Sequence, residues 1–510
     1  MGAYIAATRA GKVSGAEIAD GVVGWSGIPY AAAPVGELRL RAPEPVVAWG
    51  GVREATSYGA PALQAALEFG GASAAVGLGG VPLEIPEPSE DCLYLNVVAP
   101  AGATKLPVLV WIHGGGYQVG NATTTAGDGA AFARTHGVVV VSINYRLGAL
   151  GFLAVHGEAH SGAFGLHDQI AALRWVRENI AEFGGDPDLV TVYGISAGAK
   201  SVANLLASPL TKGLIHRAAS SSGGADHVAT PAQAAAVAEL FFGALGTGPE
   251  NVRRVDATEI LAAQNAIGGG GGMRATWLWR PAIDGRALTV HPLAAIAGGS
   301  AAGIPLLAQT CVNECFLYQL MAPDAADQAG RVLLEYFGES GRDEVLAAYT
   351  AARPELAEDP IRLGVEVMTD ERYVVPTTRL ADAQSAHAPV WRSRYDVPLT
   401  GLPPSIAPGG VIPAMHGTDG GPVWNGGEGV AALMHRAWGN FVHSGVPSAE
   451  GLVDGPKDEP ADWPGYEPSH RTTLIFDDPE PRIVEDPNGA QRAAWDGREW
   501  PSGTWWDIGA

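Results

Sequence analysis

The chain has 510 residues, 47% of them hydrophobic and 17% charged, so it can bury a large core and is not an intrinsically disordered protein. Its 32 basic and 54 acidic residues give a formal charge of −22, which disfavours binding to nucleic acids. The N-terminal segment lacks an apolar stretch of signal-peptide length, and no uninterrupted apolar run approaches the roughly 20 residues that span a bilayer. We therefore expect a cytoplasmic protein without a membrane span, unless an export signal has been removed.

The cysteine pattern points to a reducing compartment. Cys92, Cys311 and Cys315 are an odd number and too few for a disulfide framework. The chain has no HExxH motif and no paired CxxC spacing, so we expect no metal site.

Predicted strands and helices alternate from about residue 106. The first hundred residues are rich in Gly and Pro, with short alternating runs that predict an antiparallel edge. Residues 106–112 and 138–145 are short apolar runs typical of strands buried on both faces. A helical pattern follows over residues 167–183, and then another buried strand at 189–193. This order predicts an α/β fold with a mostly parallel sheet, whose functional sites lie at the carboxyl ends of the strands.

The second half of the chain predicts more helix. Residues 230–300 indicate helices interrupted by a glycine run, Gly268 to Gly272, which is typical of a surface loop. We see no tandem repeat and no clear linker, so residues 1–510 are predicted to form one domain. Residues from about 230 to 390 are expected to contribute much of a helical cap.

Residues 194–198, Gly-Ile-Ser-Ala-Gly, match the G-x-S-x-G nucleophile elbow around Ser196. In that motif a strand reverses sharply into a helix, and only glycines tolerate the crowding on both sides. The pattern is weak alone in so glycine-rich a chain. Here it lies between a predicted strand and a predicted helix, as an elbow of the α/β-hydrolase fold requires.

A second motif, His113-Gly114-Gly115-Gly116, follows the predicted strand 106–112 and matches an HGGG oxyanion loop. The N–H groups of Gly115, Gly116 and Ala197 could then stabilise a tetrahedral oxyanion. A dinucleotide-binding loop is the rival interpretation, but the segment lacks G-x-G-x-x-G spacing. A plain flexible turn stays open as an alternative.

A serine nucleophile needs a histidine base, which a carboxylate orients, and in this fold the chain order is serine, acid, histidine. Five histidines lie late enough: His387, His416, His435, His443 and His470. His416 is the preferred base, because it lies in a Gly/Pro loop after a predicted strand. Glu314 follows the apolar run 304–313 and is a candidate acid, although spacing alone identifies it weakly among many carboxylates.

These residues resemble the type-B carboxylesterases, which include bacterial p-nitrobenzyl esterases and cholinesterases. The resemblance covers nearly the whole chain. Its motifs occur in order and include GIPYAAAPVGELRLRAPEP (27–45), SEDCLYLNV (89–97), NYRLGALGFL (144–153), PAIDG (281–285) and WGNFVHSGVP (438–447).

The resemblance implies a role for each matching residue. The nucleophile falls on Ser196, the oxyanion donors on Gly115, Gly116 and Ala197, the acid on Glu314 and the base on His416. Ser222 matches a serine that supports the triad in the family, although a simple buried turn serine is nearly as good an interpretation.

Four departures from the family pattern stand out. The usual glutamate of the elbow is Ile195, which predicts a more apolar site, and the usual glycine after the acid is Cys315. Leu63 replaces the cysteine that pairs with the Cys92 position in secreted relatives. No tryptophan occurs between Val52 and Val110, where cholinesterases keep a choline-stacking aromatic residue, so a quaternary ammonium ligand is not expected.

The predicted function is a serine carboxylesterase that hydrolyses uncharged carboxylic esters through an acyl-enzyme on Ser196 and needs no cofactor. Three other reactions on the same fold stay open: acyl transfer to an alcohol, amide cleavage and a specialised biosynthetic step. A catalytically inactive binding module of cholinesterase type is a further alternative, which the intact triad disfavours. The expected partner is a small-molecule ester, and the expected state is a monomer or a weak homo-oligomer.

Overall fold

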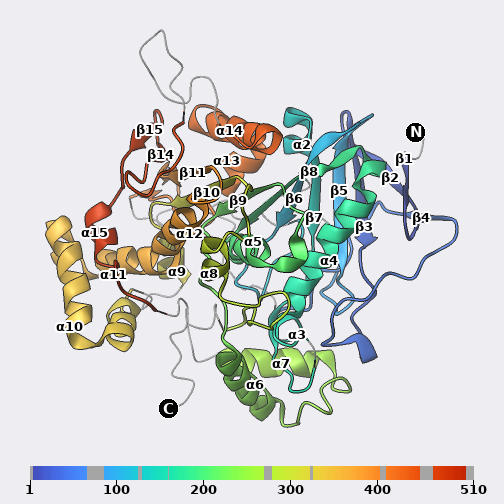
Figure 1. The fold of residues 1–510 in the computed structure, drawn as a ribbon, viewed down its shortest axis with the longest axis horizontal. Helices are drawn as coiled ribbons and strands as arrows, with labels where there is room; N and C mark the ends of the chain where they lie inside the picture. The colour runs from blue at the N-terminus through green and yellow to red at the C-terminus, as the bar shows by residue number, and fades with distance from the viewer. Residues whose placement is uncertain are drawn as a thin grey trace, which may run out of the picture.

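The computed structural model describes residues 4–65, 86–123, 129–158, 160–268, 278–321, 326–402, 409–447 and 463–500. Figure 1 shows a large twisted sheet that crosses the molecule with helices on both sides. Thirteen of its strands belong to one sheet, and two short strands form a separate ribbon. The strands are β1 (Tyr4–Thr8), β2 (Gly11–Ala19), β3 (Val22–Pro29), β4 (Val52–Glu54), β5 (Tyr94–Pro100), β6 (Leu106–Ile112), β7 (Val139–Ile143), β8 (Gly185–Ile195), β9 (Arg217–Ser221), β10 (Leu306–Cys311), β11 (Val390–Tyr395), β12 (Leu399–Thr400), β13 (Val411–Ile412), β14 (Thr473–Phe476) and β15 (Arg482–Val484).

The sheet is parallel in its centre and antiparallel at its edges. Its order is β1-β2-β3-β5-β7-β6-β8-β9-β10-β11-β14-β15, with β4 beside β2. All pairs from β7 to β14 along this order are parallel. The pairs from β1 to β7 along the same order and the β14–β15 pair are antiparallel. The mostly parallel sheet and its antiparallel N-terminal edge are therefore confirmed.

The helices cover both faces of this sheet. They are α2 (Ala130–His136), α3 (Gly148–Phe152), α4 (Phe164–Asn179), α5 (Ala197–Ala207), α6 (Pro231–Leu245), α7 (Ala257–Gly268), α8 (Pro292–Ala297), α9 (Phe316–Met321), α10 (Gln328–Ala352), α11 (Pro360–Thr369), α12 (Val375–Ser385), α13 (Gly420–Asn425), α14 (Val430–Ser444) and α15 (Gly489–Ala493). A π-helical turn, η6 (Asp370–Val374), joins α11 to α12.

The central strands alternate between two hydrophobic cores because successive side chains of a strand point to opposite faces. Val108 and Val110 of β6 join the core that includes α4 and α5. Leu109 and Trp111 of the same strand join the core that includes α2, α13 and α14. Figure 1 shows α4 and α5 in front of the strands and α14 near their upper ends.

The expected elements correspond closely to the observed ones. The helix predicted over residues 167–183 begins three residues earlier, at Phe164, and its last turn is the 3₁₀ helix η2 (Ile180–Phe183). Residues 230–390 contain helices α6 to α12, but they also supply β10 to the central sheet. Of the glycine run, Gly268 ends α7, and Gly269 to Gly272 lie outside the described residues.

No helix in the part of the chain that the structure describes is long and apolar enough to cross a bilayer. Cys92, Cys311 and Cys315 are free and buried. Leu63 and Cys92 line the same small cavity. The leucine that replaces the expected cysteine therefore lies near Cys92.

Candidate active site

The candidate nucleophile lies on a strained turn between β8 and α5. Ser196 has φ 57° and ψ −123°, a conformation that is uncommon for a residue with a side chain. A Cβ on Gly198 would overlap the carbonyl oxygen of Ile112, so this turn passes too close to β6 for any larger residue. Ser196 is 7% exposed and stands at the N-terminal end of α5, where the helix dipole favours developing negative charge.

The glycine loop after β6 lies against this turn. A Cβ on Gly114 would lie 3.0 Å from Ser196 Cβ, which places the loop beside the serine. Gly115 has φ 108° and Gly116 has φ 62°, and the backbone therefore folds tightly past the serine. His113 Nδ1 donates to Gly114 O at 2.8 Å, and its ring stacks on Tyr145. Burial lowers the pKa of His113 to about 4, so this imidazole stays neutral.

The structure brings Glu314, His416 and Ser222 together. His416 Nδ1 donates to Glu314 Oε2 at 2.7 Å, and Ser222 Oγ donates to Glu314 Oε1 at 2.6 Å. The Cys311 N–H also donates to Glu314 Oε1, at 2.6 Å. Glu314 and Ser222 are fully buried, whereas His416 is 7% exposed. The carboxylate is therefore fixed by three donors and orients the imidazole.

The order of the strands in the sheet explains how these residues come together. Ser196 follows β8, Ser222 follows β9, and Glu314 follows β10, which are adjacent parallel strands. The Ser196 N–H donates to Ser221 O at 3.0 Å, so the nucleophile turn is bonded to the end of β9. The His416 N–H donates to Glu314 O at 3.3 Å, which attaches the histidine loop to the acid turn.

Two tyrosines that the sequence analysis did not single out lie against His416. The Tyr373 ring centroid is 4.6 Å from that of His416, and the Tyr318 centroid is 6.3 Å away. Their hydroxyls are 2.6 Å apart, and burial raises the pKa of Tyr318 to about 12. Tyr373 comes from η6, which is distant in the sequence, so only the fold reveals the pairing.

Lys200 is a third residue that the sequence analysis did not single out. It lies one turn after Ser196 in α5, and it is 1% exposed. Its Nζ donates to Gly223 O at 3.0 Å and to Arg372 O at 3.2 Å, which links the end of β9 to η6. Burial lowers the pKa of Lys200. The sequence signal that could have singled out this residue is a lone lysine in a helix of mostly small and apolar residues.

The structure explains the consequences of two departures from the family pattern. Ile195 is 5% exposed and packs in the core that contains Trp111 and Tyr193. Cys315 is also buried, and its N–H donates to Thr369 Oγ1 at 3.1 Å. Cysteine therefore fits in this buried turn, next to the Glu314 that accepts from His416.

A buried aspartate lies near the acid. Asp419, three residues after His416, accepts a hydrogen bond from Gln309 Nε2 at 2.5 Å. Burial, and then the charge of Glu314, raise the pKa of Asp419.

The other late histidines have partners elsewhere. Three of them donate a ring N–H to a backbone carbonyl oxygen: His387 to Ala297, His435 to Val423, and His443 to His136. The fourth, His470, lies beside the carboxylate of Glu485. The choice of His416 as the histidine next to Glu314 is the one that the geometry supports.

One group of described side chains could hold a metal ion, namely His160, His167 and Asp284. His167 Nε2 lies 2.7 Å from Asp284 Oδ2, and Arg286 Nη1 donates to His160 Nε2 at 2.8 Å. In this structure the His167 and Asp284 atoms therefore pair with each other, and His160 Nε2 pairs with Arg286.

Comparisons with known proteins identify the family of the chain. The model of the carboxylesterase family matches residues 3–495. The para-nitrobenzyl esterase of Bacillus subtilis (strain 168) is 37% identical over 514 residues, which cover 96% of this chain and 97% of that protein. The fumonisin B1 esterase of Sphingopyxis macrogoltabida is 33% identical, over 90% of this chain and 84% of that protein. The solved structure of a thermophilic PNB esterase has a TM-score of 0.82 and 35% identity, and covers 96% of this chain and 99% of that one. The chain belongs to the carboxylesterase family and is a serine esterase of the α/β-hydrolase fold that hydrolyses carboxylic esters.

Proposed function

We propose that Ser196, His416 and Glu314 perform this hydrolysis as a catalytic triad, with Gly115, Gly116 and Ala197 as oxyanion donors. The observation that carries the proposal is the hydrogen bond from His416 Nδ1 to Glu314 Oε2 at 2.7 Å. It fixes the tautomer, because Nδ1 carries the proton and Nε2 is left to accept one from a serine hydroxyl.

In the proposed mechanism Ser196 Oγ attacks the ester carbonyl while His416 Nε2 takes its proton. The three backbone N–H groups stabilise the oxyanion, each contributing about 3 kcal/mol to the transition state. His416 then gives the proton to the leaving alcohol, and water hydrolyses the acyl-enzyme by the same route. Ser222 positions the acid by donating to Glu314 Oε1.

We propose uncharged esters as the substrates. The support is Ile195, which precedes the nucleophile where the resemblance to the family leads us to expect a glutamate, so this position supplies no carboxylate to attract a cationic substrate. Relatives named for different esters, such as the pyrethroid hydrolase Ces2a of Mus musculus (31% identical) and the human cocaine esterase (32% identical), share this scaffold. A cytoplasmic location, supported by the three free thiols, and a monomeric or weakly associated state also belong to the proposal.

The test of the nucleophile is labelling by a fluorophosphonate, followed by intact mass. We expect one adduct on the wild type and on Ser220→Ala, and none on Ser196→Ala. An adduct of equal yield on Ser196→Ala would refute the assignment.

A series of p-nitrophenyl esters with neutral, cationic and anionic acyl groups tests the substrate class. We expect kcat/KM to be highest for the neutral esters. Assays with added alcohol measure acyl transfer, and a product that is mainly the new ester would replace hydrolysis as the assigned reaction.

A further inference from the structure

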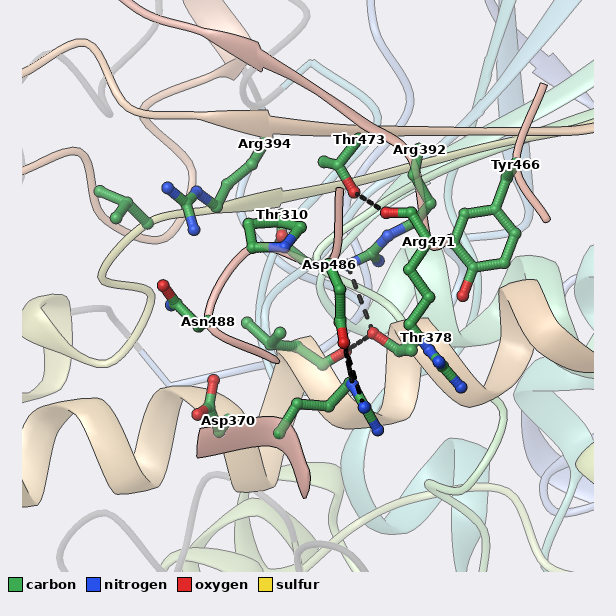
Figure 2. Close-up of a pocket in the computed structure, with 14 residues that line it drawn as sticks. Thr310, Asp370, Thr378, Arg392, Arg394, Tyr466, Arg471, Thr473, Asp486 and Asn488 are labelled. Carbon is green, nitrogen blue, oxygen red and sulfur yellow. Dashed lines mark hydrogen bonds and ion pairs between the residues drawn. The ribbon is translucent and has the colours of Figure 1, made fainter. Parts of the chain in front are cut away.

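A small cavity lies behind the acid turn, between the C-terminal half of the sheet and the segment η6–α12. Figure 2 shows the side chains around it, which come from β10, β11, η6, α12 and the C-terminal residues. Its volume is about 20 Å³, enough for a single water-sized group. Val312 lines it, two residues before Glu314, so the cavity adjoins the catalytic region without including the triad.

Strand geometry directs basic side chains toward this cavity. In the parallel β10–β11 pair, Ala308 is opposite Arg392 and Thr310 is opposite Arg394. Residues two apart on a strand share a face. Arg392 and Arg394 therefore project on one side of β11, beside Thr310 of β10, and all three line the cavity.

Four arginines line the cavity, and three of them have a carboxylate partner: Arg394 with Asp396 at 2.7 Å, Arg471 with Asp382 at 3.3 Å, and Arg492 with Asp486 at 3.0 Å. The two carboxylates that also line the cavity are already engaged. Asp486 accepts from Arg492, and Asp370 accepts from the Tyr349 hydroxyl.

Arg392 differs from the other three arginines. It is 4% exposed, and its Nη2 donates a long hydrogen bond to Thr378 Oγ1 at 3.4 Å. No carboxylate within the described ranges lies at ion-pair distance from it. Burial lowers the pKa of Arg392, because it outweighs the attraction of Asp382 and Asp486, which act on it only from beyond that distance. A buried guanidinium without a close counter-charge is costly, because desolvation is only partly offset.

The buried side-chain atoms around the cavity that lack a hydrogen-bond partner are all able to donate. In the described part of the chain they are Arg392 Nη1, Arg471 Nε and Thr310 Oγ1. Among the described residues that line the cavity, no buried carboxylate or amide oxygen is left without a donor. Such an excess of donors around one small space matches a ligand that only accepts hydrogen bonds.

We propose that this cavity binds a small inorganic anion of halide size, held by Arg392, Arg471 and Thr310. The anion supplies the counter-charge to Arg392 and accepts the N–H and O–H groups. The volume of about 20 Å³ favours a monatomic ion over a tetrahedral oxyanion. The site is separate from ester hydrolysis and does not depend on the assignment of the triad.

The first test measures thermal unfolding in sodium chloride and in sodium gluconate at one total ionic strength. We expect the Tm of the wild type to rise by about 1–3 °C as chloride replaces gluconate from about 1 to about 100 mM, because the ligand binds the folded state. Arg392→Gln should lose this rise. Arg177→Gln, which removes an equal charge from an exposed ion pair with Asp188, should keep it. An equal chloride response in Arg392→Gln, or no response in the wild type, would overturn the proposal.

The second test needs no variant and decides the question if Arg392→Gln does not fold. Wild-type crystals soaked in sodium bromide should show an anomalous peak within about 3.5 Å of an Arg392 guanidinium nitrogen, slightly farther than an N–H···O hydrogen bond because bromide is larger than oxygen. If the space holds only water, no peak will appear there in the bromide soak, and the proposal fails.

Discussion

Ser222 and His416 bind opposite oxygens of the same buried carboxylate, with Ser222 Oγ 2.6 Å from Glu314 Oε1 and His416 Nδ1 2.7 Å from Glu314 Oε2. A change at Ser222 therefore reaches the imidazole through Glu314. From the sequence, Ser222 could be either a residue that supports the triad or a simple buried turn serine. Its hydrogen bond to Glu314 favours the first role.

Ser222→Ala should lower kcat about tenfold and leave KM nearly unchanged, since a hydrogen bond to a charged group is worth about 1.5–3 kcal/mol. Steady-state kinetics on a p-nitrophenyl ester measures both constants. Ser220→Ala is the matched control, because Ser220 Oγ is buried two residues away and has no partner within the described residues. Equal kinetics for the two variants would assign Ser222 to the turn alone.

Gly120→Ala should displace the proposed oxyanion loop, residues 113–116, although Gly120 itself is not part of that loop. Gly120 has φ 110°, and a Cβ there would lie 2.5 Å from His113 Nδ1 and 2.6 Å from Gly114 O. The new methyl group must displace the loop, so we expect kcat to fall by roughly 100-fold, the usual effect of one misplaced donor.

The control for this change is Gly137→Ala, at φ 61° with open space around it. It should cost only about 1 kcal/mol of unfolding free energy, from backbone strain, and leave kcat unchanged. A Gly120→Ala enzyme with wild-type kcat would show that the loop tolerates the displacement.

Ile195→Glu, which restores the usual family residue, should destabilise this chain. Ile195 is 5% exposed and belongs to the hydrophobic core that also contains Trp111 and Tyr193, where an unpaired carboxylate costs about 3 kcal/mol or more. Ile195→Val should cost about 0.5–1.5 kcal/mol. Urea denaturation of the two variants gives the comparison, and similar midpoints would mean that the carboxylate reaches solvent.

Asp370 should make the stability of the protein depend on pH. Burial raises its pKa to about 7, above the value near 4 of an unfolded aspartate, so the folded state holds a proton that the unfolded state has lost. This contribution is complete below about pH 4 and is lost as the pH rises to about 7, by an amount of order 2–4 kcal/mol.

Asp370→Asn keeps an oxygen acceptor for Tyr349 and has no proton to lose. The difference in unfolding free energy between the Asp370→Asn variant and the wild type, measured from about pH 5 to about pH 8, should therefore grow in favour of the variant. A difference that stays constant over this interval would contradict the raised pKa.

Local patterns predicted much of the fold and the candidate site, because each depends on near neighbours along the chain. The strand before Ser196, the helix after it and the loop position of His416 follow from hydrophobic period, glycine placement and chain order. The contact of Tyr373 with His416 could not be predicted in this way, since it depends on how η6 packs against a loop more than 40 residues later. The same holds for the cavity beside Arg392, where strand pairing brings together side chains that no short motif joins.

The three thiols are 0–2% exposed, and two of them, Cys311 and Cys315, bracket Glu314. A thiol reagent added to the native enzyme can therefore react only when the chain opens. Cys92 reports opening of the N-terminal half, and the other two report opening of the acid turn. The wild-type sequence thus contains its own probes of local unfolding, and the order in which they react would show whether the acid turn opens before the rest of the molecule.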